Sequence, residues 1–313
     1  MKILVTGAAG ALGSHVAERL LKEGHEVVGI DALTPYYDPE IKKATGKILE
    51  NKGVKMIYEN LMDTDLSSRL EGVEVVFHFA AQPGIAEHVP FSDYLTNNII
   101  AMHRLLEASK ASNSLKLFVN ISTSSIYGRI ANGPETTLPA PVSHYGVTKL
   151  SAEELALSYF RRGDLPVVNL RLFSVYGERE RPEKFFHKLI KAIYEDQEIP
   201  LYEGSEKHVR SYSYVGDIVS GCLSVLDKYQ DLLGETFNIG TDKTNTTGEG
   251  IRIIEEIIGK KAKIKKVPPR VGDQLETGAD ITKAQRLLGY QPETSFAEGL
   301  KREVEWCKEF YGF

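Results

Sequence analysis

Tyr145 and Lys149 are the pair in this 313-residue chain whose types and spacing point most directly to chemistry. If a helix begins near residue 145, side chains four apart lie on one face, so the phenol and the ammonium would lie side by side. A free phenol has a pKa of about 10, and an adjacent cation lowers it by favouring the anion. Such a tyrosine could take a proton from a hydroxyl while hydride leaves the same carbon. A half-exposed surface pair is the simpler alternative, so this hypothesis needs further support.

A glycine-rich turn near the N-terminus supplies a candidate nucleotide site. An apolar, β-prone run at residues 2–6 leads into Gly7, Gly10 and Gly13, and an amphipathic segment follows to residue 23. In a strand–turn–helix unit, the first glycine allows the tight turn, the second lets the backbone approach a pyrophosphate, and the third permits close helix packing. The helix N-terminus would face the phosphates. A glycine triplet alone is a weak signal, so the neighbouring elements must support it.

Asp31 gives that support, because it directly follows a second strand-like run at residues 26–30. A carboxylate at this place can accept hydrogen bonds from the ribose diol of an adenosine. It would repel a 2′-phosphate, so the sequence favours NAD over NADP. The alternative is an ordinary loop aspartate after a buried strand.

The elements around these residues alternate between strand-like and helical patterns. Further strands are predicted at residues 55–58, 74–79, 117–121 and 236–239, and helices near residues 40–51, 93–110 and 145–162. This alternation predicts an α/β fold with a Rossmann-type, doubly wound parallel sheet and a smaller C-terminal lobe. Residues 1–175 would form the NAD-binding domain, with 211–240 returning to it, and the lobe would comprise residues 176–210 and 241–313. Ligands would bind at the carboxyl ends of the strands, where the glycine turn, residues 79–81 and residues 122–125 converge.

Composition and charge argue against several classes of protein. The chain is 42% hydrophobic and 26% charged, which is ordinary for a globular protein. Neither a membrane span nor a signal-peptide pattern is expected. The net charge of −5 gives no general attraction to nucleic acid or to a membrane. Cys222 and Cys307 have neither a CxxC spacing nor nearby histidines, so neither a disulfide framework nor a metal site is expected, and a reducing cytoplasm fits.

Several motifs together resemble the extended short-chain dehydrogenase/reductase family over nearly the whole chain. They are Gly7-x-x-Gly10-x-x-Gly13, Asp31, His78-Phe-Ala-Ala81, Asn98, Ser122-Thr123-Ser-Ser-Ile-Tyr127-Gly128 and Tyr145-x-x-x-Lys149. Other segments are similar to the nucleotide-sugar 4-epimerases of that family, in particular to UDP-glucuronate 4-epimerases. These segments are residues 31–39, 81–84, 176–186, 210–217, 238–240, 270–273 and 279–281.

The resemblance implies a role for each of these residues. Tyr145 would be the base, Lys149 would bind the nicotinamide ribose and lower the tyrosine pKa, and Thr123 would hydrogen-bond the reacting hydroxyl. The residues implied to bind NAD are Gly7, Gly10, Ala11, Leu12, Gly13, Asp31, Asn60, Leu61, Phe79, Ala80, Ala81, Asn98, Ser122, Tyr145, Lys149 and Phe173. Those implied to bind the UDP-sugar are Ser124, Ser125, Ser174, Arg181, Tyr202, Arg210, Arg270 and Asp273. Within this set Arg210 and Arg270 would hold the diphosphate, which paired guanidinium donors suit.

The resemblance also implies a reaction, the reversible C4 epimerisation of a UDP-sugar through a 4-keto intermediate. Related dehydratases and decarboxylases place carboxylates after the catalytic threonine, whereas this chain has Ser124 and Ser125. UDP-glucuronate is the expected substrate, because residues 36–38 and 179–182 resemble that subgroup. UDP-glucose or UDP-galactose is the alternative, because Ala86 stands where the glucuronate enzymes commonly carry a cation.

Two further expectations concern assembly and activity. A homodimer is expected. A regulatory protein that binds NAD without turnover is the alternative from another functional class. A broken tyrosine–lysine pair would indicate that alternative, and here Tyr145, Lys149 and Thr123 are all intact.

Some polar residues are predicted to serve no chemistry. His15 and His78 belong to no ligand cluster and are expected to be structural. Glu153 and Glu154 fall on a helical face and are expected to be solvated.

Overall fold

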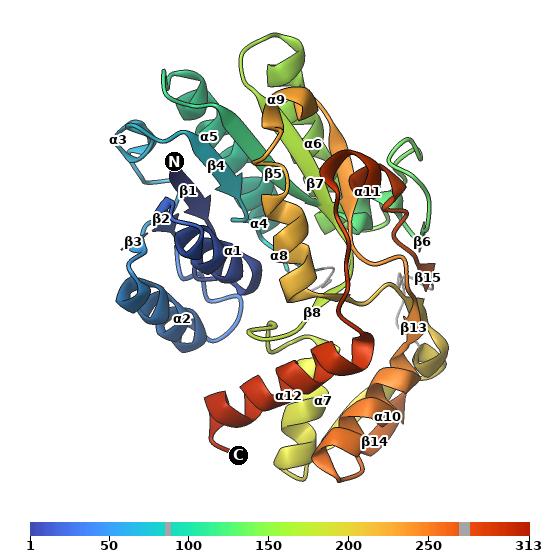
Figure 1. Cartoon of the computed structure of the whole chain (residues 1–313). Helices are drawn as coiled ribbons and strands as arrows, with labels where there is room; N and C mark the ends of the chain where they lie inside the picture. Colours follow the sequence, from blue (N-terminus) through green and yellow to red (C-terminus); the bar gives the residue numbers. More distant parts are fainter. Residues whose placement is uncertain (85–88, 269–275) are drawn as a thin grey trace.

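The computed structural model describes residues 1–84, 89–268 and 276–313 (Figure 1). At the centre of this described part is a parallel sheet of seven strands in the order β12-β7-β5-β4-β1-β2-β3. Its strands are β1 Lys2–Thr6, β2 Glu26–Ile30, β3 Lys55–Ile57, β4 Val75–His78, β5 Leu117–Thr123, β7 Val167–Leu172 and β12 Thr236–Ile239. The strand order reverses at β1, which pairs with β2 on one side and with β4 on the other. Ligands bind at such a reversal, beyond the carboxyl ends of the strands.

Helices cover both faces of this sheet. Successive side chains of a strand point to opposite faces, so a strand that is apolar throughout must be covered on both. Ile3 and Val5 of β1 belong to one hydrophobic core, and Leu4 belongs to a second. The first core includes side chains of α1 Ala11–Lys22, α2 Pro39–Lys52 and α8 Val215–Leu223. The second includes side chains of α3 Leu66–Arg69, α5 Ala101–Lys110 and α6 His144–Arg161. The predicted doubly wound α/β fold is therefore confirmed.

The strand β7 is absent from the sequence prediction, whereas the six predicted strands all occur within two residues of their expected bounds. Asn169 and Arg171 interrupt the apolar pattern of β7, yet both are buried. Asn120 Nδ2 donates to Asn169 Oδ1 at 2.9 Å, and Arg171 pairs with Glu153. These partners lie at least 18 residues away in the chain, so a local sequence pattern does not reveal that the strand is buried.

The helix predicted near residues 93–110 consists of three segments. α4 Phe91–Tyr94 continues into the π-helix η1 Leu95–Ile100 and then into α5. A π-helical turn widens the helix by one residue and often occurs at functional sites. Here it contains Asn98, one of the predicted site residues.

The smaller lobe is built mainly from the C-terminal half of the chain. Its helices α7 Phe185–Tyr194, α10 Thr247–Ile258 and α12 Phe296–Tyr311 pack against one another. Its paired strands are β9 Glu198–Tyr202 with β14 Lys263–Val267, β8 Val175–Tyr176 with β11 Ser213–Tyr214, and the set β13 Asn245–Thr246, β10 Val209–Arg210, β15 Glu276–Thr277 and β6 Ile130–Ala131. The remaining short helices are η2 Ser124–Tyr127, η3 Ser205–Lys207, α9 Tyr229–Leu232 and α11 Thr282–Leu288.

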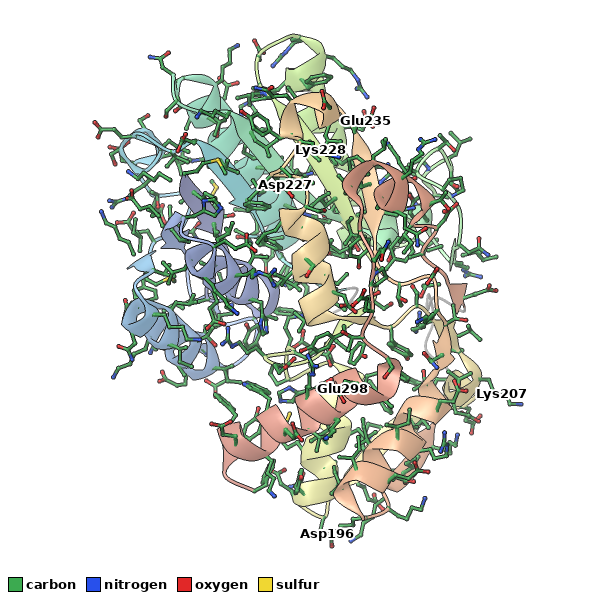
Figure 2. The ribbon with its side chains drawn as sticks, viewed as in Figure 1. Asp196, Lys207, Asp227, Lys228, Glu235 and Glu298 are labelled. Atoms are coloured by element: carbon green, nitrogen blue, oxygen red, sulfur yellow. The ribbon has the colours of Figure 1, made fainter. Side chains whose placement is uncertain are left out.

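Ion pairs and aromatic contacts hold the lobe together. Figure 2 shows Asp196 at the end of the lobe that is distant from the sheet, where its carboxylate pairs with Lys260 and Lys263. Near the sheet, the Tyr212 and Phe296 rings stack with centroids 5.0 Å apart. This contact joins the segment after β10 to the start of α12.

The C-terminal part of the chain also contacts the central sheet. α11 packs against β12, and Lys283 Nζ donates to the Thr236 carbonyl at 2.7 Å. Tyr290 donates its hydroxyl to the Gly240 carbonyl at 2.9 Å. The described structure therefore has no visible break at residues 175, 210 or 240. The division of the chain into an NAD-binding domain and a lobe that binds the sugar nucleotide stays a prediction.

Two observations bear on the class of protein. Among the helices of the described residues, none combines the length and the apolar composition that crossing a bilayer requires. Cys222 and Cys307 are both buried and free.

Candidate active site

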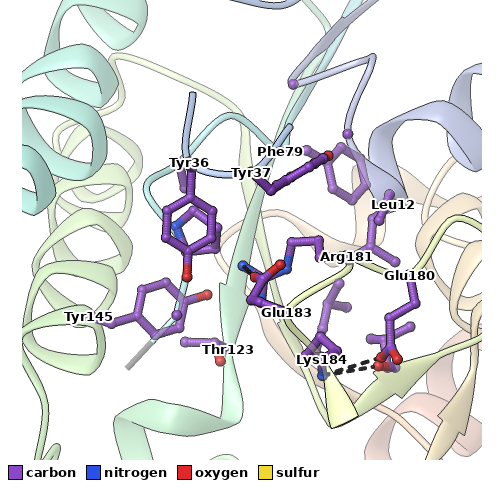
Figure 3. A pocket seen from close by; sticks show the side chains of 18 of the residues that line it. Leu12, Tyr36, Tyr37, Phe79, Thr123, Tyr145, Glu180, Arg181, Glu183 and Lys184 are labelled. Carbon is purple, nitrogen blue, oxygen red and sulfur yellow. Dashed lines mark hydrogen bonds and ion pairs between the residues drawn. The ribbon is translucent and has the colours of Figure 1, made fainter. Parts of the chain in front are cut away.

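A cleft of about 1200 Å³ lies at the carboxyl ends of the sheet strands, where residues of the lobe face the sheet (Figure 3). The predicted site residues that line it are Gly7, Gly10, Ala11, Leu12, Gly13, Asp31, Asn60, Leu61, Phe79, Ala80, Ala81, Ser122, Thr123, Ser124, Ser125, Tyr145, Lys149, Phe173, Ser174, Arg181, Tyr202 and Arg210. Asn98 is not part of this lining, and Arg270 and Asp273 fall outside the described residues. The fold thus brings most of the predicted residues together, while their individual roles stay predictions.

The glycine turn is so close to neighbouring backbone that two of its positions exclude a side chain. Gly7 has φ +69°, and a Cβ there would lie 2.8 Å from Ala80 N. A Cβ on Gly13 would overlap the carbonyl oxygen of Gly7. The turn therefore packs directly on the chain that follows β4. It leads into α1, which begins at Ala11 without a side-chain cap, so the first N–H groups of the helix can face an anion.

Asp31 directly follows β2 and is only 8% exposed. Its two carboxylate oxygens accept hydrogen bonds from Ala9 N at 3.0 Å and from Leu33 N at 2.8 Å. These bonds fix the carboxylate beside the glycine turn. Each oxygen keeps a lone pair, so the carboxylate can also accept from a ribose diol.

Lys42 also belongs to this region, although no motif predicts it as a site residue. It lines the cleft, is 7% exposed, and donates from Nζ to the Thr34 carbonyl oxygen at 2.9 Å. Its ammonium also lies 4.5 Å from the centre of the Tyr37 ring. The lysine-rich stretch after residue 39 is its only signal in the sequence, and that pattern does not distinguish it from the exposed Lys43.

Asn98 lies behind the cleft wall rather than on it. Its side chain accepts from Gln82 N at 2.7 Å and donates to the Gln82 carbonyl oxygen at 3.1 Å. The same amide donates to Thr148 Oγ1 at 3.0 Å. Asn98 therefore ties the segment after β4 to α6, next to Lys149, and would act on a cofactor through those elements.

Tyr145 lies in the first turn of α6, which Ser143 caps by accepting from Gly146 N at 3.1 Å. A Cβ on Gly146 would lie 2.7 Å from the Ser125 carbonyl oxygen, so the helix approaches the segment after β5 very closely. Thr123, the last residue of β5, hydrogen-bonds with the Tyr145 phenol. The predicted base and its predicted partner thus lie close together, and both are labelled in Figure 3.

The pKa of Tyr145 differs from its expected direction. Burial raises the pKa of the phenol, whereas the nearby Arg181 charge and the hydrogen bond with Thr123 act to lower it. The prediction that Lys149 brings about a lowered pKa of Tyr145 is therefore wrong for this structure, because loss of hydration outweighs the Arg181 charge and the Thr123 hydrogen bond.

Lys149 is 4% exposed, and burial lowers its pKa to about 8, while the charge of Glu153 acts to raise it. Among the described residues, no hydrogen bond or ion pair involves its ammonium. A buried ammonium loses the hydration it would have in water, so it gains from hydroxyl groups that reach it. The Lys149 ammonium can therefore donate hydrogen bonds to a ligand in the cleft.

His78 and Glu153 flank this lysine and have structural partners. The imidazole of His78 lies 2.8 Å from Thr6 Oγ1, and burial lowers its pKa to about 3, which supports the predicted structural role. The prediction of a solvated Glu153 is wrong. Its side chain is fully buried and pairs with Arg171, which comes from β7 and not from a sequence neighbour.

The serine and arginine side chains predicted to hold a sugar nucleotide line both walls of the cleft. Ser124 and Ser125 follow Thr123 in η2, and Ser125 N donates to Thr123 Oγ1 at 3.2 Å. Arg181 Nη1 lies 3.0 Å from Glu183 Oε1, but the two groups are not aligned for a hydrogen bond. Both atoms are buried, and neither has a hydrogen-bond partner within the described structure. Arg181 can therefore donate to a ligand without first breaking a hydrogen bond.

These features fit NAD. The glycine turn and the start of α1 suit a pyrophosphate, Asp31 suits the adenosine ribose, and the unengaged Lys149 ammonium suits a second ribose. The three groups line one continuous cleft. The donors and acceptors present are therefore those that a dinucleotide needs.

Comparisons with known proteins give relatives over the full chain. Residues 3–240 match the model of the NAD dependent epimerase/dehydratase family. An uncharacterized UDP-glucose epimerase of Bacillus subtilis is 42% identical over 99% of both chains. A UDP-glucuronate 4-epimerase of Arabidopsis thaliana is 34% identical over 100% of this chain and 72% of its own. The crystal structure of a UDP-glucuronic acid 4-epimerase from Bacillus cereus, in complex with UDP-glucuronic acid and NAD, matches with a TM-score of 0.95 and 40% identity over 99% of this chain and 100% of that one.

Proposed function

The chain belongs to the NAD dependent epimerase/dehydratase family, as its motifs predict, and we propose that it catalyses the reversible C4 epimerisation of a UDP-sugar with NAD as its cofactor. The observation that carries this proposal is the convergence of Tyr145, Lys149 and Thr123 in one cleft that has the features of a dinucleotide site. A non-catalytic binding protein would not need this set of residues.

Each of the three side chains has a distinct task in this proposal. When bound, NAD would accept a hydride from C4 of the sugar and return it to the opposite face. Tyr145 takes the proton from the 4-hydroxyl and later gives it back, and Thr123 holds that oxygen through a hydrogen bond. Lys149 holds the nicotinamide ribose with its ammonium, while the charge of Arg181 and the hydrogen bond with Thr123 act against the rise that burial causes in the pKa of Tyr145.

The residues after Thr123 favour epimerisation over elimination. Ser124 and Ser125 occupy the positions at which related dehydratases and decarboxylases would carry a carboxylate. A hydroxyl does not take up a proton from a neighbouring sugar carbon at neutral pH. The keto-sugar would therefore keep its other bonds until the hydride returns.

We propose UDP-glucuronate as the sugar nucleotide. Oxidation at its C4 yields a β-keto acid, which loses carbon dioxide readily when the carboxylate turns out of the carbonyl plane, so the carboxylate must be held firmly. The hydroxyls of Ser124, Ser125 and Ser174 line the cleft near Thr123, and Arg181 supplies a cation. A hydrogen bond to a charged group contributes about 1.5–3 kcal/mol. UDP-glucose remains the second candidate, because the Bacillus subtilis relative carries that name and Ala86 removes one expected cation.

The proposal extends to domains, assembly and location. Residues 1–175 and 211–240 would hold NAD, and residues 176–210 and 241–313 the nucleotide of the sugar. A homodimer is supported by exposed apolar side chains on adjoining helices, namely Phe91 of α4, Leu95 of η1 and Val147 of α6. The two free cysteines suit a reducing cytoplasm.

The experiment follows the purified protein with UDP-glucuronate and, separately, with UDP-glucose by nuclear magnetic resonance of the sugar. We expect UDP-galacturonate from the former, no net consumption of NAD, and the higher kcat/KM for the uronate. A tenfold or greater preference for UDP-glucose, about 1.4 kcal/mol, would assign the neutral sugar instead. Loss of carbon dioxide or water as the main outcome would overturn the reaction type. No turnover of any UDP-sugar with NAD bound would identify a binding protein.

A further inference from the structure

The segment between β2 and α2, residues 31–38, runs along the cleft from the Asp31 end to the Tyr145 end. Asp31 fixes its start through Leu33 N, and Lys42 fixes its middle through the Thr34 carbonyl oxygen. Asp38 ends it as the N-cap of α2. The backbone is therefore held at three places, so a side chain projecting from this segment has a defined position.

Tyr36 is the side chain that projects from this segment toward the sugar end. It lines the cleft, and the Arg181 guanidinium lies over its ring, 5.6 Å from the ring centre. Figure 3 shows the hydroxyl end of Tyr36 directed toward Tyr145, with Arg181 beside it. The nearness of the two tyrosines is also seen in their electrostatics, because Tyr36 acts to raise the pKa of the Tyr145 phenol.

Gly84 is a second, independent sign that the cleft wall is shaped around Tyr36. It has φ +89°, and a Cβ on it would overlap the Tyr36 hydroxyl. The Gly84 carbonyl oxygen accepts from the Tyr94 hydroxyl at 2.7 Å, and the Tyr94 ring lies 6.5 Å from that of Tyr145. Tyr36 therefore meets the wall that also supports the catalytic tyrosine.

Arg181 needs such a support. Its pairing with Glu183 lacks hydrogen-bond alignment, so this carboxylate does not fix the direction of the guanidinium. A planar cation over an aromatic face is held by the ring quadrupole, and the contact is worth about 0.5–2 kcal/mol depending on hydration. The Tyr36 ring is thus the surface against which Arg181 lies when it faces the cleft.

We propose that Tyr36 is a positioning residue for the epimerisation, which holds the Arg181 guanidinium at the sugar end of the cleft and closes that end opposite Tyr145. The inference rests on the proposed function, since it assigns a task within that reaction. Its consequence is that the aromatic face, and not the hydroxyl, carries the effect. Loss of the face should weaken the hold on the anionic sugar before and after oxidation.

The first test measures binding without turnover. UDP-glucuronate is titrated by calorimetry into the NAD-bound Tyr145→Phe variant, alone and combined with Tyr36→Leu or Tyr36→Phe. We expect Tyr36→Leu to weaken binding by roughly fivefold to thirtyfold, and Tyr36→Phe to bind within about threefold of the parent. Tyr58→Leu is the matched control, because Tyr58 is 44% exposed and lies outside the cleft lining. Equal binding by the Leu and parent proteins would overturn the proposal.

A double-mutant cycle tests whether Tyr36 acts through Arg181. Arg181→Met removes the cation but keeps much of the bulk, so Tyr36→Leu should have little further effect in that background. Additive losses of affinity would contradict the assigned route. If Tyr36→Leu is poorly folded, Tyr36→Phe replaces it in the cycle. Arg181→Met combined with Tyr36→Phe should then bind UDP-glucuronate as tightly as Arg181→Met alone. A larger loss of affinity would contradict the assigned role of the ring face.

Turnover separates this inference from the proposed function. With Tyr145 intact, Tyr36→Leu should raise KM and release some oxidised keto-sugar into solution, detected by mass spectrometry. The C4 hydride would then remain on the cofactor as NADH. Tyr36→Phe should restore the wild-type pattern. If the wild-type protein epimerises UDP-glucuronate and Tyr36→Leu matches it in KM and in product, the inference is wrong and the function stands. If the wild-type protein turns over no UDP-sugar, the proposed function itself has failed.

Discussion

Arg171 of β7 and Glu153 of α6 form a buried ion pair on the helix that carries Tyr145 and Lys149. Glu153 lies one helical turn beyond Lys149, so the pair fixes the helix that carries both proposed reactive side chains. Arg171 Nη1 also donates to the Tyr127 hydroxyl at 2.7 Å. That hydroxyl donates to Asn238 Oδ1 at 2.8 Å, which extends the network from α6 and β7 to η2 and β12.

Replacing one partner of this pair should destabilise the protein strongly. Arg171→Met leaves the Glu153 carboxylate buried without a cation, and such losses cost about 3–5 kcal/mol. The free energy of unfolding from urea titration checks this. Arg252→Met is the control, because its partner Glu256 and Arg252 itself are both 61% exposed, and an exposed pair contributes about 0.3–0.5 kcal/mol. Similar losses in the two variants would show that the buried pair has no special weight.

Lys149 should make the stability of the nucleotide-stripped protein depend on pH. Burial lowers its pKa from 10.5 to about 8, so between these values the unfolded chain binds more protons than the folded chain. Stability contributed by this group therefore rises with pH across that window, by about 1.4 kcal/mol per pKa unit. Unfolding titrations at about pH 7.5 and about pH 9.5 should show wild-type protein gaining stability relative to Lys149→Met. A constant difference between the two proteins would contradict the buried ammonium.

Asn98 should affect the cofactor although it lies outside the cleft lining. Asn98→Asp keeps the acceptor for Gln82 N but loses the donors to the Gln82 carbonyl and to Thr148, which should cost about 1–3 kcal/mol of unfolding free energy. Because the same bonds hold the segment after β4, the affinity for NAD should also fall. Asn51→Asp, on the exposed surface, is the charge-matched control. Reduced stability with unchanged NAD affinity would limit Asn98 to a purely structural role.

The glycine turn and the strand beside it were predictable because their geometry is local. Gly7 and Gly13 must be glycine for the turn to close, and Asp31 follows β2 directly, so spacing alone places all three. The tyrosine–lysine pair is predictable for the same reason, since a single helix sets its geometry. Local patterns therefore identify one half of the cleft.

The remainder depends on partners that are distant in sequence. Arg171 and Glu153 are polar residues in a strand and on a helix, and only the folded sheet makes them a buried pair. The direction of the Tyr145 pKa depends on how deeply the lobe buries the phenol, which no spacing gives. Tyr36 belongs to a motif of the subgroup, but its place beside Arg181 follows from the path of residues 31–38 along the cleft.

Tyr145→Phe should retain the fold and NAD while turnover almost disappears. Only the ionisable oxygen is lost, and removal of a general base typically costs about 10²–10⁴ in rate. Cofactor content of the purified variant and its unfolding midpoint establish that the site is intact. Thr123→Val, which removes the hydroxyl partner but not the base, should lower the rate by a smaller factor. A Tyr145→Phe protein as active as wild type would exclude Tyr145 as the base.

Isotope retention tests whether one hydrogen leaves C4 and returns to the other face of the same sugar. UDP-glucuronate carrying deuterium at C4 is incubated with the protein in ordinary water, and the epimer is analysed by nuclear magnetic resonance and mass spectrometry. If the hydride passes from C4 to the cofactor and back to the same sugar, the epimer should keep its deuterium at C4. Replacement of the deuterium by hydrogen from water would contradict the account, because that result requires deprotonation at carbon instead of hydride transfer.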